Sequence, residues 1–255
     1  MPWDPAQYLR FVDHRLRPAI DLLNRIDLAA PAEVYDLGAG AGNVTRYLRA
    51  RWPEAHITGV DESEAMLAEA AQTPGIDWQR ADLAVWQPPR AVDLIYSNAA
   101  LHWLSDHARL FPSLLAHLAP GGVLAVQMPR MFSEPSHQLV AEAARSGPWR
   151  ATLEPLLRPP PVAEPAFYYD LLAPLAAAVD IWETAYVHVL EGDDPVKEWL
   201  KGSWLPQFLS ALEEPQRSAF EAHYARLVAG AYPRRPDGHT LLPFRRLFIV
   251  ATTRA

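Results

Sequence analysis

Three glycines stand at alternate positions directly behind an apolar run that ends in an acid. In "VYDLGAGAGNVT", Asp36 precedes Gly38, Gly40 and Gly42. Glycine at this density lets the backbone turn sharply and lets a ligand approach main-chain atoms closely. A carboxylate beside such a loop attracts an ammonium group and repels a phosphate. The pattern therefore favours a ligand that carries a positive charge near the end of a strand.

Two ligands compete for this loop, the pyrophosphate of a dinucleotide and the amino-acid end of S-adenosylmethionine. Pyrophosphate-binding turns prefer G-x-G-x-x-G, whereas the spacing here is G-x-G-x-G. The spacing and Asp36 both favour S-adenosylmethionine. A tight strand-to-helix turn without a ligand is the remaining alternative.

Two further acids stand at the ends of the next two expected strands. Asp61 closes "HITGVD", where an acid can accept hydrogen bonds from both ribose hydroxyls. Asp82, in "RADLAVW", is similarly placed for an adenine amino group. Asp61 could instead cap a helix, and Asp82 could be a surface acid.

Arginines supply the candidate sites for an anionic substrate. Arg246 stands between Phe244 and Phe248 in an expected strand, so alternation puts all three on one face. A guanidinium there needs an anion, either a substrate carboxylate or a protein acid. Arg17 and Arg130 are further candidates for the anchor. For Arg17 the alternative is a solvated helix position.

Polar and aromatic residues follow the expected fourth strand in "NAALHWLSDH". Asn98 is a candidate cofactor ligand, and His102 and Trp103 are candidates for positioning the substrate. Trp103 could equally be a core residue. His102 is not expected to bind a metal, because only Asp106 lies at helical spacing from it. We expect no metal site.

These residues need a sheet to position them, and the first half of the chain alternates strands with helices. After a helix at 5–25, strands are expected at 33–40, 56–61, 76–86, 91–98 and, after a Pro-Gly-Gly turn, up to 129. A helix at 43–52 is expected to begin at Asn43 as its cap. This alternation predicts an α/β fold with a doubly wound, mostly parallel sheet covered on both faces.

Two more strands, at 179–190 and 241–254, complete seven, and residues 195–230 are expected to be mostly helical. The stretch "RPPPVAEPAFYY" is expected to be irregular. We interpret residues 1–255 as a single Rossmann-like domain with insertions at about 131–175 and 194–236. Ligands bind beyond the carboxyl ends of such strands, so the insertions are expected to form a helical substrate lid.

Composition excludes several other classes of protein. The 255 residues have a formal net charge of −7, which argues against a general nucleic-acid binder. The chain has no cysteine, so disulfides and thiolate chemistry are excluded. No apolar run approaches about 18 residues, and the N-terminal residues lack a signal-peptide core, so no membrane partner is expected. The cytoplasm is the expected location.

Several stretches together resemble a known enzyme family. "YDLGAGAGNVT", "ITGVDESEAM", "ADLAVW" and "LAPGGVLAVQMP" are similar to motifs of class I S-adenosylmethionine-dependent methyltransferases. "NAALHWLSDH", "FYYDLL", "VDIWETAYVH" and "FRRLFIVAT" resemble the trans-aconitate 2-methyltransferase family, and the similar stretches run from about residue 8 to the C-terminus. That family methylates one carboxylate of trans-aconitate to a monomethyl ester.

The resemblance implies S-adenosylmethionine as cofactor and a small tricarboxylate as substrate. An ionised carboxylate needs no general base, so no catalytic acid or base is expected. The candidate cofactor-binding residues are Asp36, Gly38, Gly40, Asn43, Asp61, Met66, Asp82, Leu83 and Asn98. The candidate substrate-binding residues are Tyr8, Arg17, Trp103, Arg130, His137, Tyr169, Trp204 and Arg246. A hydroxyl or amine acceptor, or a non-catalytic cofactor-binding module, are the alternative functions.

Overall fold

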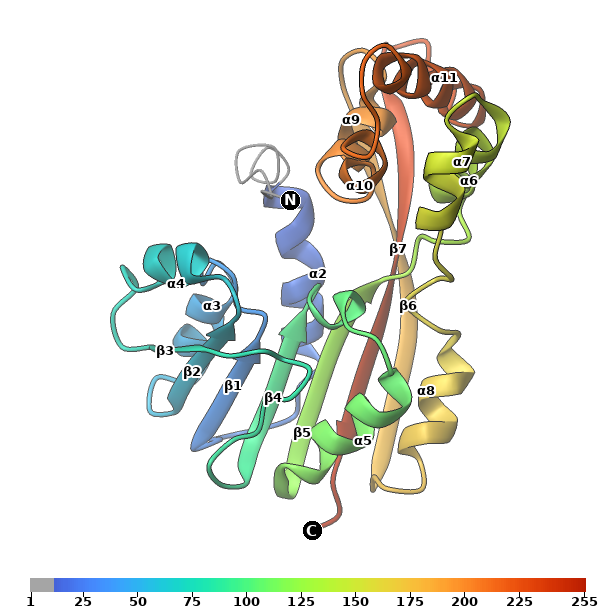
Figure 1. Cartoon of the computed structure of the whole chain (residues 1–255). Helices are drawn as coiled ribbons and strands as arrows, with labels where there is room; N and C mark the ends of the chain where they lie inside the picture. The colour runs from blue at the N-terminus through green and yellow to red at the C-terminus, as the bar shows by residue number, and fades with distance from the viewer. Residues whose placement is uncertain (1–11) are drawn as a thin grey trace. The chain divides into compact units, whose positions relative to one another are not determined.

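The fold is a seven-stranded sheet in the order β3-β2-β1-β4-β5-β7-β6 (Figure 1). The computed structural model describes the backbone of residues 12–255, and the side chains from residue 16 onward. The strands are β1 (Glu33–Leu37), β2 (His56–Asp61), β3 (Asp77–Arg80), β4 (Val92–Asn98), β5 (Leu118–Pro129), β6 (Ala178–Leu190) and β7 (Thr240–Thr252). The first five strands pair in parallel, and β7 pairs antiparallel with β5. The prediction of a mostly parallel seven-stranded sheet is therefore confirmed.

The chain divides into two compact units, which we describe separately. The sheet unit contains Arg15–Pro129, Pro161–Thr184 and Arg246–Ala255. Most of the helical unit is Arg130–Pro160 and Ala185–Arg245. Strands β6 and β7 contribute residues to both units.

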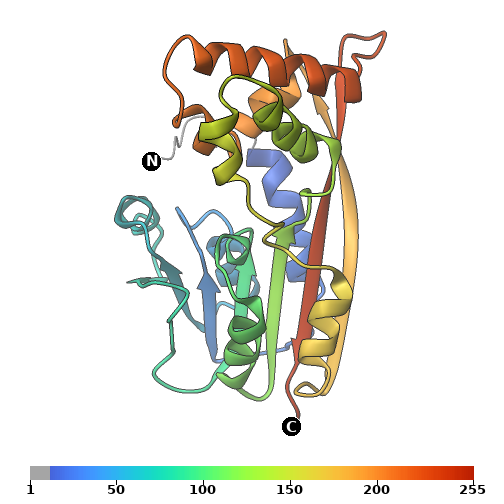
Figure 2. The same cartoon turned by 45° about the vertical axis from the view of Figure 1, so that its right-hand side comes forward.

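The buried centre of the sheet unit is formed by strands that contain apolar runs. In β4, Leu94, Ile95 and Tyr96 are all fully buried, because helices cover both faces of the strand. Figures 1 and 2 show α5 (His107–Ala116) and α8 (Pro165–Leu172) on one face and α2 (Val12–Asn24) on the other. The Tyr96 hydroxyl donates to the Ala19 carbonyl of α2 over 2.8 Å, which fixes that helix against β4. The remaining helices of this unit are α3 (Thr45–Arg51), α4 (Glu64–Ala70) and the 3₁₀ turn η1 (Leu101–Trp103).

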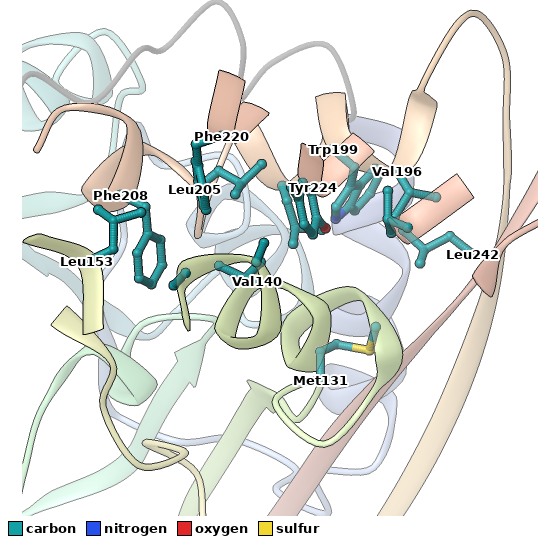
Figure 3. Close-up of a cluster of buried hydrophobic side chains, with 14 of the residues drawn as sticks. Met131, Val140, Leu153, Val196, Trp199, Leu205, Phe208, Phe220, Tyr224 and Leu242 are labelled. Carbon is teal, nitrogen blue, oxygen red and sulfur yellow. The ribbon is translucent and has the colours of Figure 1, made fainter. Parts of the chain in front are cut away.

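A separate apolar core holds the helical unit together (Figure 3). Trp199, Phe208, Phe220 and Tyr224 are at most 2% exposed and pack with Val140. Within the described residues, the helices of this unit are α6 (Pro135–Ser146), α7 (Arg150–Leu153), α9 (Pro195–Lys201), α10 (Pro206–Leu209) and α11 (Gln216–Ala231), with the 3₁₀ turn η2 (Glu154–Leu156). No helix within residues 12–255 has the length and apolar character needed to cross a membrane.

Three local expectations were wrong. Asn43 does not cap α3, because the helix begins at Thr45 and its N-cap residue is Val44, with no side-chain cap bond. The Pro-Gly-Gly segment is not a free turn but lies inside β5, where the pairing with β4 shifts register and Gly121 has φ +74°. A glycine in this conformation permits such a bulge. The proline-rich stretch is also not irregular throughout, because Pro165 occupies the first turn of α8, where proline is tolerated.

Candidate active site

Asp36 is a buried acid at the carboxyl end of β1. Asp36 is only 2% exposed, and its Oδ2 accepts a hydrogen bond from the Thr45 hydroxyl over 2.7 Å. Burial raises the pKa of Asp36 to about 7, the Thr45 bond opposes this rise, and the negative charge of Asp61 adds to it. A carboxylate that burial makes costly to ionise is stabilised most when a cationic group approaches it.

The glycine loop connects the ends of β1 and β2. The Gly38 amide donates to the Val60 carbonyl over 2.8 Å, and the Gly40 amide donates to Asp61 Oδ2 over 2.9 Å. A Cβ on Gly38 would lie 2.1 Å from the Ala100 Cβ, so only glycine fits there. Gly40 has φ +56°, and a Cβ on it would meet no atom within 4 Å. Gly38 therefore allows close packing, whereas Gly40 borders open space that a ligand can enter.

The acids after β2 and β3 both organise the local backbone. Asp61 Oδ1 accepts from the Ser63 amide over 2.9 Å, so each of its two oxygens holds one amide. A carboxylate has about four acceptor positions, which leaves capacity for hydroxyl donors. Asp82 is exposed, and its Oδ1 accepts from the Ala84 amide over 2.8 Å. Asp61 does not cap a helix, because the N-cap residue of α4 is Ser63.

Three other candidate cofactor residues lie around this loop. Leu83 is half-buried, and its Cδ1 would be 3.7 Å from a Cβ on Gly38, so it borders the loop. Asn43 is half-buried in the segment that leads into α3. Met66 lies in the first turn of α4, where its amide donates to the Ser63 hydroxyl over 3.4 Å.

A second group of polar residues gathers where β4 and β5 end, beside the middle of β7. Asn98 is paired with Gln127 in the parallel register, and Arg246 is paired with Pro129 in the antiparallel one. Arg246 is 4% exposed, and its Nη1 donates to Gln127 Oε1 over 3.4 Å. With His102, these residues form what we call the polar cluster: Asn98, His102, Gln127 and Arg246. Of its atoms, Asn98 Oδ1, His102 Nδ1 and Gln127 Nε2 are buried without a hydrogen-bond partner among the described residues.

His102 is an uncharged member of this cluster. Burial lowers its pKa to about 3, and the positive charge of Arg246 and the nearby His107 act in the same direction. Trp103 is 62% exposed, and its ring lies 4.7 Å from the His102 ring, centroid to centroid. The core alternative for Trp103 is therefore not what the structure shows.

The aromatic neighbours of Arg246 pack into different cores. Phe248 stacks on Trp182 in the sheet unit, with centroids 4.7 Å apart and an interplanar angle of 6°. Phe244 belongs to the helical unit, where its ring lies 5.7 Å from Trp199. Arg246 is thus held between two residues that are fixed by their own packing.

The remaining substrate candidates of the sheet unit are more dispersed. Arg17 is exposed on α2. Tyr169 is 54% exposed on α8, whereas its neighbour Tyr168 is fully buried and its hydroxyl lies 2.7 Å from His107 Nδ1. Since α8 packs on α5, the structure places Tyr169 on an outer surface and not in the polar cluster. Tyr8 lies outside the described residues.

In the helical unit, two predicted residues come together. The His137 ring lies 5.8 Å from Trp204, and Phe132 lies 5.2 Å from each of these rings. Burial lowers the pKa of His137 to about 4, so its imidazole is neutral at physiological pH.

Arg130 is the buried arginine of the helical unit. It is 9% exposed, and its amide donates to the Arg245 carbonyl over 3.0 Å. Arg245 forms an ion pair with Glu134 at 2.9 Å. Arg245 is therefore committed to a protein acid.

Sequence reasoning did not single out two residues of these groups. Gln127 was contained in a recognised motif but is a neutral residue in an apolar run, and only the antiparallel register of β5 with β7 places it near Arg246. Phe132 follows β5 in an insertion without any periodic pattern. Polar residues inside buried strands are the one sequence signal that could have found Gln127.

The comparisons with known proteins first define a class. Residues 34–122 match the family described as "Methyltransferase domain". The structure resembles a Haemonchus contortus phosphoethanolamine N-methyltransferase 2 bound to phosphomonomethylethanolamine and S-adenosylhomocysteine, with a TM-score of 0.56 at 16% identity, over 94% of this chain and 53% of that one. The YcgJ protein of Bacillus subtilis gives a TM-score of 0.59 at 15% identity, over 94% and 99%. The fold is the Rossmann-like fold of S-adenosylmethionine-dependent methyltransferases.

Curated relatives identify the family. The trans-aconitate 2-methyltransferase of Azoarcus sp. strain BH72 is 48% identical over 98% of both chains. The enzyme of the same name from Methylobacterium radiotolerans is 49% identical over 98% of this chain and 97% of its own. The Yersinia pestis strain Pestoides F enzyme is 46% identical over the same shares. This chain belongs to the trans-aconitate 2-methyltransferase family.

Proposed function

We propose that this protein transfers a methyl group from S-adenosylmethionine to one carboxylate of trans-aconitate and so forms a monomethyl ester. Membership of the family at 46–49% identity over nearly the whole chain supports the reaction. The single structural observation that carries it is Arg246, a permanently charged group that is 4% exposed and lies opposite the last residue of β5. A buried guanidinium suits a substrate that carries carboxylates.

The residues around the glycine loop fit the cofactor. Asp36 would hold its ammonium group, and Gly40, which borders open space, would admit its amino-acid end. Asp61 would accept from the ribose hydroxyls with its free acceptor positions, and Asp82 would accept from the adenine amino group. The other members of this proposed set are Gly38, Asn43, Met66, Leu83 and Asn98. When bound, S-adenosylmethionine supplies an electrophilic methyl group on a sulfonium.

The protein's task toward the substrate is orientation. The acceptor carboxylate is ionised at neutral pH, since its reference pKa is about 4, so no side chain has to remove a proton. Proximity and orientation can lower the barrier by about 7–11 kcal/mol. We assign Arg246 to a non-reacting carboxylate, and His102 and Trp103 to positioning. His102, being neutral, can donate one hydrogen bond without adding charge.

Of the insertions predicted at 131–175 and 194–236, the parts that lie in the helical unit, 131–160 and 194–236, are proposed as the substrate lid, because α8 covers a face of the sheet. Arg130, His137 and Trp204 are its proposed contacts, with Tyr8 and Arg17 as further candidates. His137 and Trp204 already form one aromatic group with Phe132. We propose the cytoplasm as location and no nucleic-acid partner, in keeping with the net charge of −7.

Two measurements test this function in order. Calorimetry with S-adenosylhomocysteine first establishes the cofactor site. Formation of S-adenosylhomocysteine from S-adenosylmethionine is then followed with trans-aconitate, other carboxylic acids, alcohols and amines. Turnover with trans-aconitate is expected to exceed that with every non-acid. Faster turnover of an alcohol or amine would show that the acceptor is not a carboxylate. Cofactor binding without turnover of any compound would show that the protein is a cofactor-binding module and not an enzyme.

A further inference from the structure

Gln127 is a fully buried amide in the middle of the candidate substrate site. It is 0% exposed near the end of β5, one residue before the Met128-Pro129 end of that strand. Its Oε1 accepts from Arg246 Nη1, but its Nε2 donor has no partner among the described residues. Leaving a buried donor unsatisfied costs about 1–3 kcal/mol. An unsatisfied donor at a fully buried position therefore requires a structural or functional explanation.

A second buried nitrogen, on a different element, has the same property. His102 Nδ1, on η1 after β4, is buried and without a hydrogen-bond partner among the residues that the structure describes. The 3₁₀ turn η1, which carries His102, contacts β5, the strand that carries Gln127. The two unsatisfied nitrogens therefore lie on contacting elements, and one of them belongs to the side chain that binds Arg246. This arrangement matches the needs of a carboxylate, which accepts several hydrogen bonds at once.

We propose that Gln127, His102 and Arg246 form one carboxylate-binding subsite, in which Gln127 both orients the Arg246 guanidinium through Oε1 and donates to the same substrate carboxylate through Nε2. This inference rests on the proposed function and specifies which protein groups recognise a non-reacting carboxylate of the substrate. An amide is suited to this double role because it carries an acceptor and a donor on one planar group. The Gln127–Arg246 bond of 3.4 Å is long, so the guanidinium can shift toward an arriving anion.

A structural alternative is available on the neighbouring strand. Asn98 Oδ1 is a buried acceptor without a partner among the described residues, and Asn98 is paired with Gln127 in the register. A bond from Gln127 Nε2 to this oxygen would make Gln127 a link between β4 and β5. In that case its loss would lower stability and leave substrate discrimination unchanged.

Two substitutions at residue 127 separate these roles. Gln127→Met keeps the volume but removes both polar contacts, and Gln127→Glu removes the donor and adds a negative charge beside Arg246. The matched control is Ser97→Ala, because Ser97 is also fully buried in β4 but lies on the opposite face, where its hydroxyl donates to the Leu37 carbonyl over 2.7 Å. Melting temperature and S-adenosylhomocysteine affinity establish that each variant is folded.

The readout is kcat/KM for trans-aconitate and for dicarboxylic analogues that each lack one of its carboxylates. We expect Gln127→Met to lower the value for trans-aconitate about ten- to a hundredfold, the range for hydrogen bonds to charged groups, and Gln127→Glu to lower it further. The analogue that lacks the anchored carboxylate should lose less than about threefold. Combining Gln127→Met with Arg246→Lys should cost less than the product of the single losses, because both changes act on the same carboxylate.

Three results would overturn the inference. One is a Gln127→Met variant with wild-type cofactor affinity and a kcat/KM for trans-aconitate within about twofold of wild type. Another is an equal loss for all the analogues. The third is a Ser97→Ala variant with the same loss. If the wild-type protein does not turn over trans-aconitate, the proposed function fails. The carboxylate-binding subsite is then tested separately, by calorimetric comparison of trans-aconitate binding to wild type and to Gln127→Met. Equal affinities would overturn the subsite as well.

Discussion

The backbone amide of Gly40 donates a hydrogen bond to Asp61 Oδ2 over 2.9 Å. The acid proposed to bind the ribose therefore also fixes the loop proposed to admit the amino-acid end of the cofactor. Its other oxygen holds the Ser63 amide at the start of α4. One carboxylate thus connects the ends of β1 and β2, and its removal should affect two parts of the cofactor site together.

We expect Asp61→Ala to weaken S-adenosylhomocysteine binding by roughly 1.5–3 kcal/mol for each charge-assisted bond lost, less what water recovers. Asp61→Asn should weaken it less, because an amide keeps one acceptor oxygen. Calorimetry measures both, with Glu62→Ala as a control at the neighbouring exposed acid. An unchanged affinity in folded Asp61→Ala would show that a group other than Asp61 binds the ribose.

Asp36 should reduce stability at neutral and alkaline pH. Its folded-state pKa is raised to about 7, so the native state holds the proton more tightly than the unfolded chain does. The free energy of unfolding of the cofactor-free protein should therefore fall as pH rises from about 4 to about 7. Asp36→Asn cannot ionise, so at pH 8 it should be more stable than wild type, by at most about 4 kcal/mol.

The same Asp36→Asn variant should bind S-adenosylhomocysteine weakly, because the ammonium loses its anion. Denaturant unfolding of both proteins at pH 5 and pH 8, combined with calorimetry, tests the two effects together. Equal stability differences at the two pH values, or a variant that binds as tightly as wild type, would contradict this role of Asp36.

Much of the sheet was predictable because its strands carry strong local signals. The strands β1 and β2 are largely apolar runs that end at or near an acid, and Asp82 follows β3 in the order of the chain. Two of the three errors came from glycine and proline, whose effects depend on tertiary context. Pro-Gly-Gly is a typical turn, yet strand pairing continues through it here because Gly121 adopts a positive φ inside β5.

The polar cluster was only partly predictable. Arg246 could be proposed from alternation between two phenylalanines, since a charge on an apolar face is unusual. Gln127 could not, because its importance depends on the antiparallel register that sets β7 beside β5. The sequence also could not tell Tyr168 from Tyr169, since the choice depends on α8 packing against His107 of α5.

His56, the first residue of β2, should contribute a pH-dependent stabilisation. Its Nδ1 lies 3.0 Å from Glu33 and its Nε2 lies 2.8 Å from Asp77, and these two bonds raise the pKa of His56. The stabilisation is fully present below the unfolded pKa of about 6.5 and is lost as pH rises through the higher folded value.

His56→Ala should therefore lower the free energy of unfolding more at pH 5.5 than at pH 9. The difference should be below about 1 kcal/mol, because His56 is half exposed and solvent screens the pair. Urea unfolding at the two pH values measures it. A larger loss at pH 9 than at pH 5.5 would contradict the ion-pair interpretation.

The chemical step should be independent of pH across about pH 6.5–9, above the pKa of the acceptor carboxylate. The two buried histidines proposed for the substrate site do not titrate in this range, since burial holds His102 near pKa 3 and His137 near pKa 4. Single-turnover rates with both substrates saturating measure this step. A rate that climbs tenfold per pH unit would indicate a base and an acceptor other than a carboxylate.

Arg246 should matter for the substrate and not for the cofactor. Arg246→Lys keeps the charge but loses the planar fork, so trans-aconitate turnover should fall. Arg246→Ala should cost more, on the order of 2–5 kcal/mol in kcat/KM if the pair is desolvated. S-adenosylhomocysteine affinity should barely change, because the proposed cofactor acids belong to the first three strands.

The matched control for Arg246 is Arg245→Ala, since the adjacent arginine is already paired with Glu134. It should leave kcat/KM for trans-aconitate much closer to wild type than Arg246→Ala does. If Arg246→Ala stays within about twofold of wild type, Arg246 is structural and the anchor lies at another arginine such as Arg17 or Arg130.

The central claim is methyl transfer to a carboxylate, and the product tests it most directly. Trans-aconitate is incubated with the protein and S-adenosylmethionine labelled on its methyl group, and the acid is analysed by mass spectrometry before and after mild alkali. We predict one labelled methyl group per trans-aconitate, present as an ester that alkali removes. Unmodified trans-aconitate under conditions where S-adenosylhomocysteine binding is intact, or a labelled product that resists alkali, would contradict the claim.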